Sequence, residues 1–208
     1  TAELTKLGNS FETVVIGGTD YEGDISLSGA AMGFADPVKI QTSGLVTLAG
    51  QLSTPDLQVS QGTVKVDSDL VLNVASLSFG QGVKIQTADN ASLTIKGVSA
   101  DQAIVLGSSG AAGALVLGDN LTQALSEVTN TVTLGDGQQA IDVTGDVSFA
   151  QSIALNAQSL NMGADAKLTV AGDASLASST GMNLGSITAS GSVTIADLGS
   201  QISSAGTG

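Results

Sequence analysis

The sequence predicts an all-β protein, a right-handed parallel β-helix (β-solenoid) of roughly 9–10 coils with a short helix near residues 120–128. Three observations predict it. Apolar and polar residues alternate over very short segments, these segments recur at nearly even spacing, and one pentapeptide is repeated farther along the chain. The composition agrees, because only four Phe and one Tyr occur in 208 residues, and a thin solenoid has no wide centre for aromatic side chains to fill.

The predicted strands are triplets in which two apolar side chains share one face and the residue between them points the other way. Turn residues such as Gln61-Gly62, Asp67-Ser68-Asp69 and Gly80-Gln81-Gly82 separate the triplets. Three strands with turns of similar length make a coil of roughly 20–22 residues. Hairpin strands run longer and turn at two-residue loops, so a sandwich or another β fold is the weaker alternative. The triplets are 57–59, 64–66, 70–72, 77–79, 83–85, 132–134, 141–143, 147–149, 153–155, 160–162, 168–170 and 193–195.

Internal repetition supports a solenoid. Val-Lys-Ile-Gln-Thr occurs at 38–42 and again at 83–87, and this offset of 45 residues predicts two coils. The central lysines Lys39, Lys65 and Lys84 are expected to point outward, where lysine discourages lateral aggregation; a ligand-binding lysine row is the alternative. We interpret residues 1–208 as a single β-solenoid segment of a much longer repeat protein, with internal repeats at roughly 1–118 and 119–208.

One segment breaks the strand rhythm. Leu121, Ala124, Leu125 and Val128 recur at i, i+3, i+4 and i+7, the spacing of a two-turn amphipathic helix. Asp119 or Asn120 is the expected N-cap. We expect this helix to lie over a coil edge as a decoration, and residues 1–7 to be the tail of a similar element.

The charge excludes several classes of partner. Nineteen acidic residues against six lysines, with no Arg and no His, give a net charge of −13, which repels nucleic-acid phosphates and anionic lipid. The sequence has no run of 18 consecutive apolar residues, so membrane insertion is not predicted. The absence of Cys rules out disulfides and thiolate metal sites.

The segments 13–17 and 23–29 match 131–135 and 140–145, and a third pair without a preceding helix is 103–107 and 113–118. Their shared pattern, Val-x-Ile-Gly followed by Gly-x-Ile-x-Leu-x-Gly, resembles a unit of filamentous-haemagglutinin-like large bacterial exoproteins. Many of these surface adhesins are exported by two-partner secretion, and their shafts are right-handed β-helices. The resemblance implies a secreted protein of the bacterial cell surface with a role in cell adhesion. It supplies no active-site residues.

Catalytic, cofactor-binding and metal-binding residues are not predicted, and we expect the chain not to be an enzyme. Lyases built on β-helices use Arg or Lys as base, and galacturonases use paired Asp with nearby His, Arg and Lys; because this chain has no Arg and no His, most of those sites cannot be assembled. A glycosidase needs only two carboxylates about 5–9.5 Å apart; Asp67 and Asp69 could share a face, although Asp-Ser-Asp is an ordinary turn sequence. If a cofactor binds, Ca²⁺ near Asp20, Glu22 and Asp24 is the candidate, with solvated turn acids as the preferred interpretation. An ice-binding face would need regular Thr ladders, and the threonines are scattered, at 47, 94, 133 and 169.

Three functions therefore remain open. The preferred one is a shaft or spacer segment of a surface adhesin. The alternatives are a self-assembling extracellular fibre or matrix subunit and a carbohydrate-active β-helix. Expected partners are neighbouring repeats or copies end to end, and a host or neighbouring cell surface. Because an end coil exposes unpaired backbone, we expect end-to-end association or frayed ends near residues 1–10 and 198–208.

Overall fold

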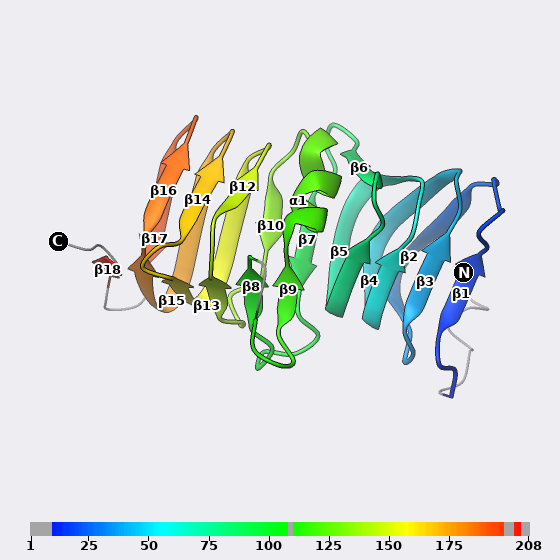
Figure 1. The fold of residues 1–208 in the computed structure, drawn as a ribbon, viewed down its shortest axis with the longest axis horizontal. Helices are drawn as coiled ribbons and strands as arrows, with labels where there is room; N and C mark the ends of the chain where they lie inside the picture. Colours follow the sequence, from blue (N-terminus) through cyan, green and yellow to red (C-terminus); the bar gives the residue numbers. More distant parts are fainter. Residues whose placement is uncertain (1–9, 108–109, 198–201, 205–208) are drawn as a thin grey trace.

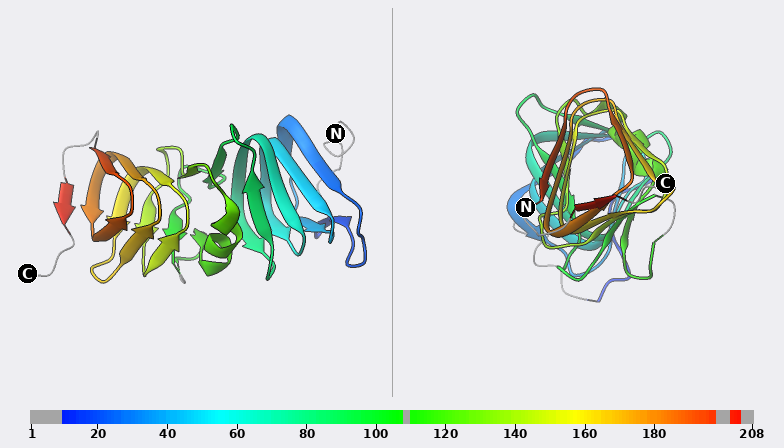
Figure 2. Two further views of the ribbon diagram at one scale, coloured as in Figure 1. Left: turned by 90° about the horizontal axis from the view of Figure 1, so that it is seen from above. Right: turned by 90° about the vertical axis from the view of Figure 1, so that its left-hand side faces the viewer.

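The computed structural model describes residues 10–107, 110–197 and 202–204. They form a parallel β-solenoid of about nine turns with one short helix. Figures 1 and 2 show a rod in which the coils follow one another from the N-terminal to the C-terminal end. The predicted β-solenoid is confirmed. Among the described residues, no helix has the length and apolar character needed to cross a bilayer.

The described residues form eighteen strands, one α-helix and one 3-10 turn. In chain order they are β1 (Val14–Gly17), β2 (Ile25–Gly33), β3 (Val38–Gln41), β4 (Leu45–Val59), β5 (Thr63–Phe79), β6 (Lys84–Thr87), β7 (Leu93–Lys96), β8 (Ile104–Leu106), β9 (Leu115–Leu117), α1 (Asp119–Ala124), η2 (Leu125–Glu127), β10 (Val132–Leu134), β11 (Ile141–Val143), β12 (Val147–Phe149), β13 (Ile153–Met162), β14 (Lys167–Val170), β15 (Ala174–Leu184), β16 (Ser186–Ala189), β17 (Val193–Asp197) and β18 (Ile202–Ser204).

Each coil crosses three faces, which the end-on view of Figure 2 shows as the sides of a triangle. Face 1 contains β1, β3, the last parts of β4 and β5, then β9, β8, β11, the later parts of β13 and β15, and β18. Face 2 contains the first parts of β2, β4 and β5, then β6, and beyond the helix β12, β14 and β16. Face 3 contains the end of β2, the middle of β4 and β5, then β7, β10, the first parts of β13 and β15, and β17.

Two strands are far longer than the predicted triplets. β4 has 15 residues and β5 has 17, and each continues across all three faces. The predicted turn Asp67-Ser68-Asp69 lies inside β5 with all three residues exposed. The register passes from Leu48↔Val66 to Gly50↔Leu70, so the three residues bulge opposite Ala49. The corner is therefore a bulge in a continuous strand, which bends a strand without ending it.

The core is a stack of inward apolar side chains. On face 3 one inward position is occupied in successive coils by an aliphatic residue that is at most 2% exposed, and each packs on the next. Aliphatic side chains fill this narrow interior, and each contributes about 1.5–3 kcal/mol on burial. The ladder consists of Leu52, Leu72, Ile95, Leu134, Leu155 and Leu176.

The predicted two-coil offset of 45 residues is wrong. Val38 of β3 pairs with Leu57, and Leu57 pairs with Leu77, so two coils from Val38 take 39 residues. The second pentapeptide begins at Val83 and continues into β6, which lies on face 2 beside Thr63 rather than on face 1. The identical sequences serve different faces because both need only inward apolar and outward polar side chains.

The predicted short helix is confirmed, but it ends at Ala124, residues 125–127 form the 3-10 turn η2 and Val128 is extended. Its cap and its role also differ from the prediction. Leu121, Ala124, Leu125 and Val128 are all buried. The N-cap is Gly118, without a side-chain cap hydrogen bond, and Asp119 lies in the first turn. In Figure 1, α1 lies between β6 and β12 on face 2, where a strand would otherwise stand, so it forms part of the wall and is not a decoration. The predicted element at 1–7 lies outside the described residues.

The repeated Val-x-Ile-Gly unit marks a corner, not a fixed place in the coil. Its glycines Gly17, Gly107 and Gly135 have φ values of +90°, +135° and +78°, a region that side chains disfavour. The unit lies on face 1 at β1 and on face 3 at β10. In the third copy, β8 and β9 pair with each other on face 1, and β9 stands on the N-terminal side of β8.

Candidate functional site

The two carboxylates proposed as a glycosidase pair have separate structural partners. Asp67 forms an ion pair with Lys65 at 2.6 Å. Asp69 accepts hydrogen bonds from the hydroxyl and the backbone amide of Ser92, at 2.7 and 2.9 Å. Both hydrogen bonds lower the pKa of Asp69 below its ordinary value, and the bond from the hydroxyl has the larger effect. A general acid requires the opposite shift.

Asp69 represents a recurring device, which we call a corner brace. A corner brace is an aspartate that comes directly before a segment of inward-pointing apolar residues. Its carboxylate accepts a hydrogen bond from the backbone N–H at the matching corner of the next coil. Asp24 accepts from the amide of Leu45 at 2.9 Å. Asp173 accepts hydrogen bonds from the amide and the hydroxyl of Ser192 at 2.7 and 2.9 Å. Both bonds lower the pKa of Asp173, and the bond from the amide has the larger effect.

The corner braces were not predicted from the sequence. Each pairs residues about 20 positions apart, such as Asp69 with Ser92 and Asp173 with Ser192. Such pairs become visible only when the length of each coil is known. The signal that could have found Asp69 and Asp173 is an aspartate before an apolar triplet, followed one coil later by serine before the next triplet.

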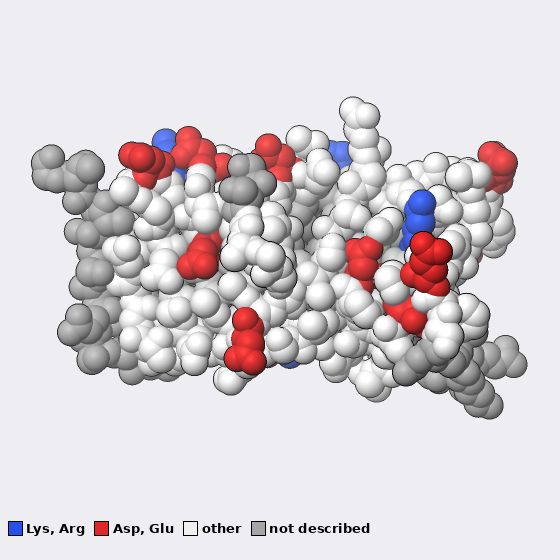
Figure 3. All heavy atoms as spheres, turned by 60° about the horizontal axis from the view of Figure 1, so that its bottom comes forward, with Lys and Arg blue, Asp and Glu red and all other residues white. Residues whose placement is uncertain are grey.

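The proposed calcium ligands Asp20, Glu22 and Asp24 are exposed, and Asp24 is already a corner brace. Within residues 10–107, 110–197 and 202–204, no group of three acidic side chains is placed to hold a metal ion. On the surface shown in Figure 3, the acidic side chains are dispersed along the rod and do not gather around one hollow.

The three lysines of the pentapeptide-like triplets lie between buried neighbours and point outward, as predicted. They do not form a row, because Lys39 is on face 1 opposite Gln58, whereas Lys65 is on face 2 opposite Thr47 and Gln86. Lys84 donates to the hydroxyl of Ser126 at 2.8 Å. A lysine-lined binding row is therefore contradicted.

The threonines are as scattered as the sequence indicated. Thr94 lies opposite Thr133 on face 3. Thr47 and Thr169 are both on face 2, but the helix separates their strands. A regular threonine ladder is not formed by these four residues.

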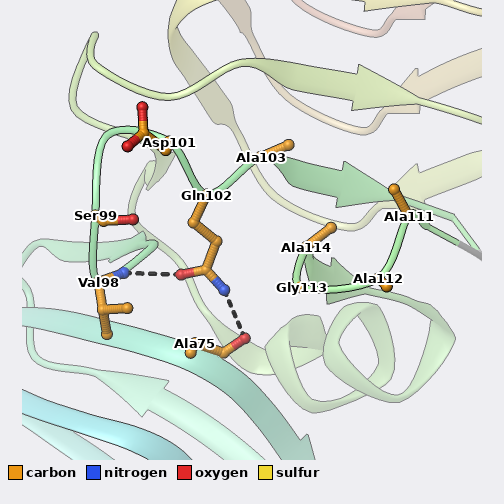
Figure 4. A pocket seen from close by; sticks show the side chains of 10 residues that line it. All are labelled: Ala75, Val98, Ser99, Asp101, Gln102, Ala103, Ala111, Ala112, Gly113 and Ala114. Atoms are coloured by element: carbon orange, nitrogen blue, oxygen red, sulfur yellow. Dashed lines mark hydrogen bonds between the residues drawn. The ribbon is translucent and has the colours of Figure 1, made fainter.

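A hollow with a volume of about 440 Å³ lies where the loop at 97–103 faces the loop at 111–114. Figure 4 shows the Gln102 side chain in it, with its amide oxygen accepting from Val98 N–H at 2.9 Å and its amide nitrogen donating to the Ala75 carbonyl at 2.8 Å. The amide is thus occupied in joining two coils. Asp101 is the one ionisable residue among the lining residues, so a nucleophile–base pair is not assembled there.

A second hollow, of about 270 Å³, lies between the end of β5 and the start of α1. Its lining mixes apolar and polar groups. Leu77, Ser78, Phe79 and Val116 come from strands, and Asp119 and Asn120 come from the helix. Neither hollow contains Asp67, Asp69 or a corner brace.

Comparisons of this chain with protein-family models, with curated proteins and with solved structures found no match. The resemblance to filamentous-haemagglutinin-like exoproteins therefore depends on the strand and glycine pattern alone, and that pattern marks corners of the solenoid.

Proposed function

We propose that this chain is a structural shaft or spacer segment of a large bacterial cell-surface adhesin or exoprotein, secreted and non-catalytic. The observation that carries the proposal is the apolar ladder of face 3, which passes through consecutive coils from Leu52 to Leu176. A solenoid of this kind gains length in equal steps, because each added coil repeats the same contact with its neighbour.

The use of the polar residues supports a spacer. Three aspartates that could have supplied chemistry instead hold consecutive coils together at their corners. The net charge of −13 repels neighbouring rods of the same kind and keeps them apart. Both features favour a spacer role, in which the rod sets a distance, and neither favours a catalytic role.

A deletion that preserves the register tests the proposal in cells displaying the protein. Removing residues 38–76 joins Pro37 to Leu77, which occupies the register of Val38 two coils later. The rod should stay folded and shorten by about 10 Å, because paired strands lie about 4.8 Å apart. Adhesion should be retained, since the segment only sets reach.

Removing residues 38–82 is the matched control. It joins Pro37 to Val83 and places a face 2 strand on face 1, so this variant should lose its β circular dichroism signal. A folded 38–76 variant that no longer supports adhesion would place the binding surface inside the deleted coils and overturn the spacer proposal.

A second candidate, a self-assembling fibre, is favoured by the C-terminal coil. Val193 and Ile195 are 45% and 43% exposed, although their ladder partners Ala174 and Leu176 are at most 1% exposed. These side chains have the inward position of a coil that another coil would cover. The occupant that we propose is the first coil of a second copy, in which the end of β2 is the face 3 strand.

Sedimentation equilibrium of the purified chain distinguishes the two candidates. Val193→Ser with Ile195→Ser should reduce end-to-end association at least tenfold. Val98→Ser is the control, because Val98 is 44% exposed on the side of the rod. A chain that stays monomeric at high concentration, or that associates equally well in all variants, would exclude the fibre.

A further inference from the structure

Face 1 of the solenoid is interrupted in the middle of the rod. Residues 77–79 of β5 pair with β4 on one side, and β9 pairs with β8 on the other side of the break. In the described part of the chain, no strand pairing joins β5 to β9. The hollow lined by Leu77, Phe79 and Val116 lies between them instead.

Face 2 is interrupted at the same level. β6 pairs with β5, and β12 begins a separate three-stranded sheet with β14 and β16. The helix α1 and the turn η2 fill the gap and bury Leu121, Ala124 and Leu125. Side-chain packing therefore replaces the backbone hydrogen bonds that join other coils on this face.

Among the described residues, only face 3 has strand pairing that is continuous at this level. The connection consists of three residue pairs between β7 and β10, Leu93↔Val132, Thr94↔Thr133 and Ile95↔Leu134. Between β4 and β5, by contrast, thirteen pairs extend over all three faces. The backbone ladder across the middle of the rod is thus reduced to one side of the triangle.

Polar side chains add modest links across this level. Lys96 forms an ion pair with Asp136 at 2.8 Å, and Gln86 donates to Glu127 at 2.7 Å. Asn130 donates to two backbone carbonyls of the preceding coil. Ion pairs and hydrogen bonds at partly exposed sites contribute little, so the buried side chains of the helix and of the β7–β10 pair carry most of the coupling.

We propose that residues 97–107 and 110–131 form a joint at which the solenoid divides into two cooperative units, an N-terminal stack (residues 10–96) and a C-terminal stack (residues 132–197). In a stacked repeat protein, stability is a sum of coil terms and nearest-neighbour contacts. The boundary with the weakest contact is where one unit opens while the other stays folded. This inference concerns the mechanics of the rod and is independent of what the rod carries.

Hydrogen exchange measured by mass spectrometry on the whole chain, in increasing urea below the unfolding transition, tests the joint. Peptides from the N-terminal stack should exchange together, peptides from the C-terminal stack should exchange together, and the two groups should differ in their urea dependence. A single group that includes all coils, or a boundary elsewhere, would overturn the proposal.

Two leucine variants sharpen the test. Leu176→Ala, at a position with 0% exposure in the C-terminal stack, should accelerate exchange at least tenfold in that stack and less than twofold in the other. Leu125→Ala, also at 0% exposure, should accelerate exchange of β6 and β12 and move the two groups farther apart. Equal acceleration of both stacks by Leu176→Ala would show that the rod is one cooperative unit. The Leu176→Ala result decides the question even where Leu125→Ala fails to fold.

Discussion

Replacing Val66 with aspartate should severely destabilise the protein, whereas replacing its neighbour Lys65 with serine should change stability little. Val66 is 0% exposed and points into the coil between Leu48 and Thr87 of the adjacent coils. Lys65 points outward, and its ion pair with Asp67 joins side chains that are 44% and 47% exposed. Such an exposed pair contributes less than about 1 kcal/mol.

The expected loss of unfolding free energy in Val66→Asp has two parts. Loss of the buried apolar side chain removes about 2 kcal/mol. The new carboxyl group cannot stay ionised in the apolar interior, and burial raises its pKa by about three units or more. Protonating it at pH 7 then costs about 4 kcal/mol, at 1.36 kcal/mol for each unit. The sum of about 6 kcal/mol approaches the whole stability of many domains, which is about 5–15 kcal/mol.

Urea unfolding followed by far-ultraviolet circular dichroism between pH 5 and pH 8 measures both parts. The folded-state pKa of the new carboxyl group lies above its unfolded value, so the penalty is full above the folded pKa and diminishes as the pH falls through it. Val66→Asn is the matched control, because it buries a polar group without this pH dependence. Equal losses of unfolding free energy in Val66→Asp and Lys65→Ser would refute the inward position of Val66 and the outward position of Lys65. A pH-independent loss in Val66→Asp would refute these positions as well.

Two further predictions concern the corners. Asp173→Asn should lower stability at neutral pH and flatten its acid dependence: the pKa of Asp173 is lowered in the folded state by Ser192, so its contribution is present above about pH 3.9 and disappears as the pH falls through the lowered value. Unfolding curves at pH 7 and pH 3 measure this, and parallel acid dependence in both proteins would contradict it. Gly50→Ala should destabilise by more than about 2 kcal/mol, because φ is +84° and a Cβ would collide with the carbonyl of Gly29. Gly33→Ala is the control, since a Cβ there meets nothing within 4 Å, and a thermal melt that shifts equally in both would contradict the prediction.

Local alternation was enough to predict which residues form the core. Val64, Val66, Leu70 and Leu72 are buried, and Lys65 between them points outward, as their spacing indicated. Helical spacing likewise predicted the burial of Leu121 and Ala124 in α1, and of Leu125 and Val128 just beyond its end. In both cases the period of the element, two for a strand and 3.6 for a helix, places side chains on a face without any long-range information.

The roles of the acidic residues could not be predicted without knowing which residues lie beside them in the neighbouring coil. Asp69 belongs to an ordinary turn-like sequence, and nothing in its immediate neighbours indicates that Ser92 will donate two hydrogen bonds to it. The same holds for Asp24 and the amide of Leu45. A polar side chain at a corner is assigned a role only when its partner in the next coil is known.

The sequence alone determined the period of the strands, the burial of their side chains and the existence of a stacked β fold. The tertiary structure decided which face each strand occupies, the place of the helix in the wall, and the position of β9 ahead of β8 in the stack. The physical reason is that register depends on the summed lengths of all corners. One coil takes 18 residues from Val46 to Val64 but 23 from Leu70 to Leu93, and bulges and left-handed glycines change that sum without altering the alternation of the strands.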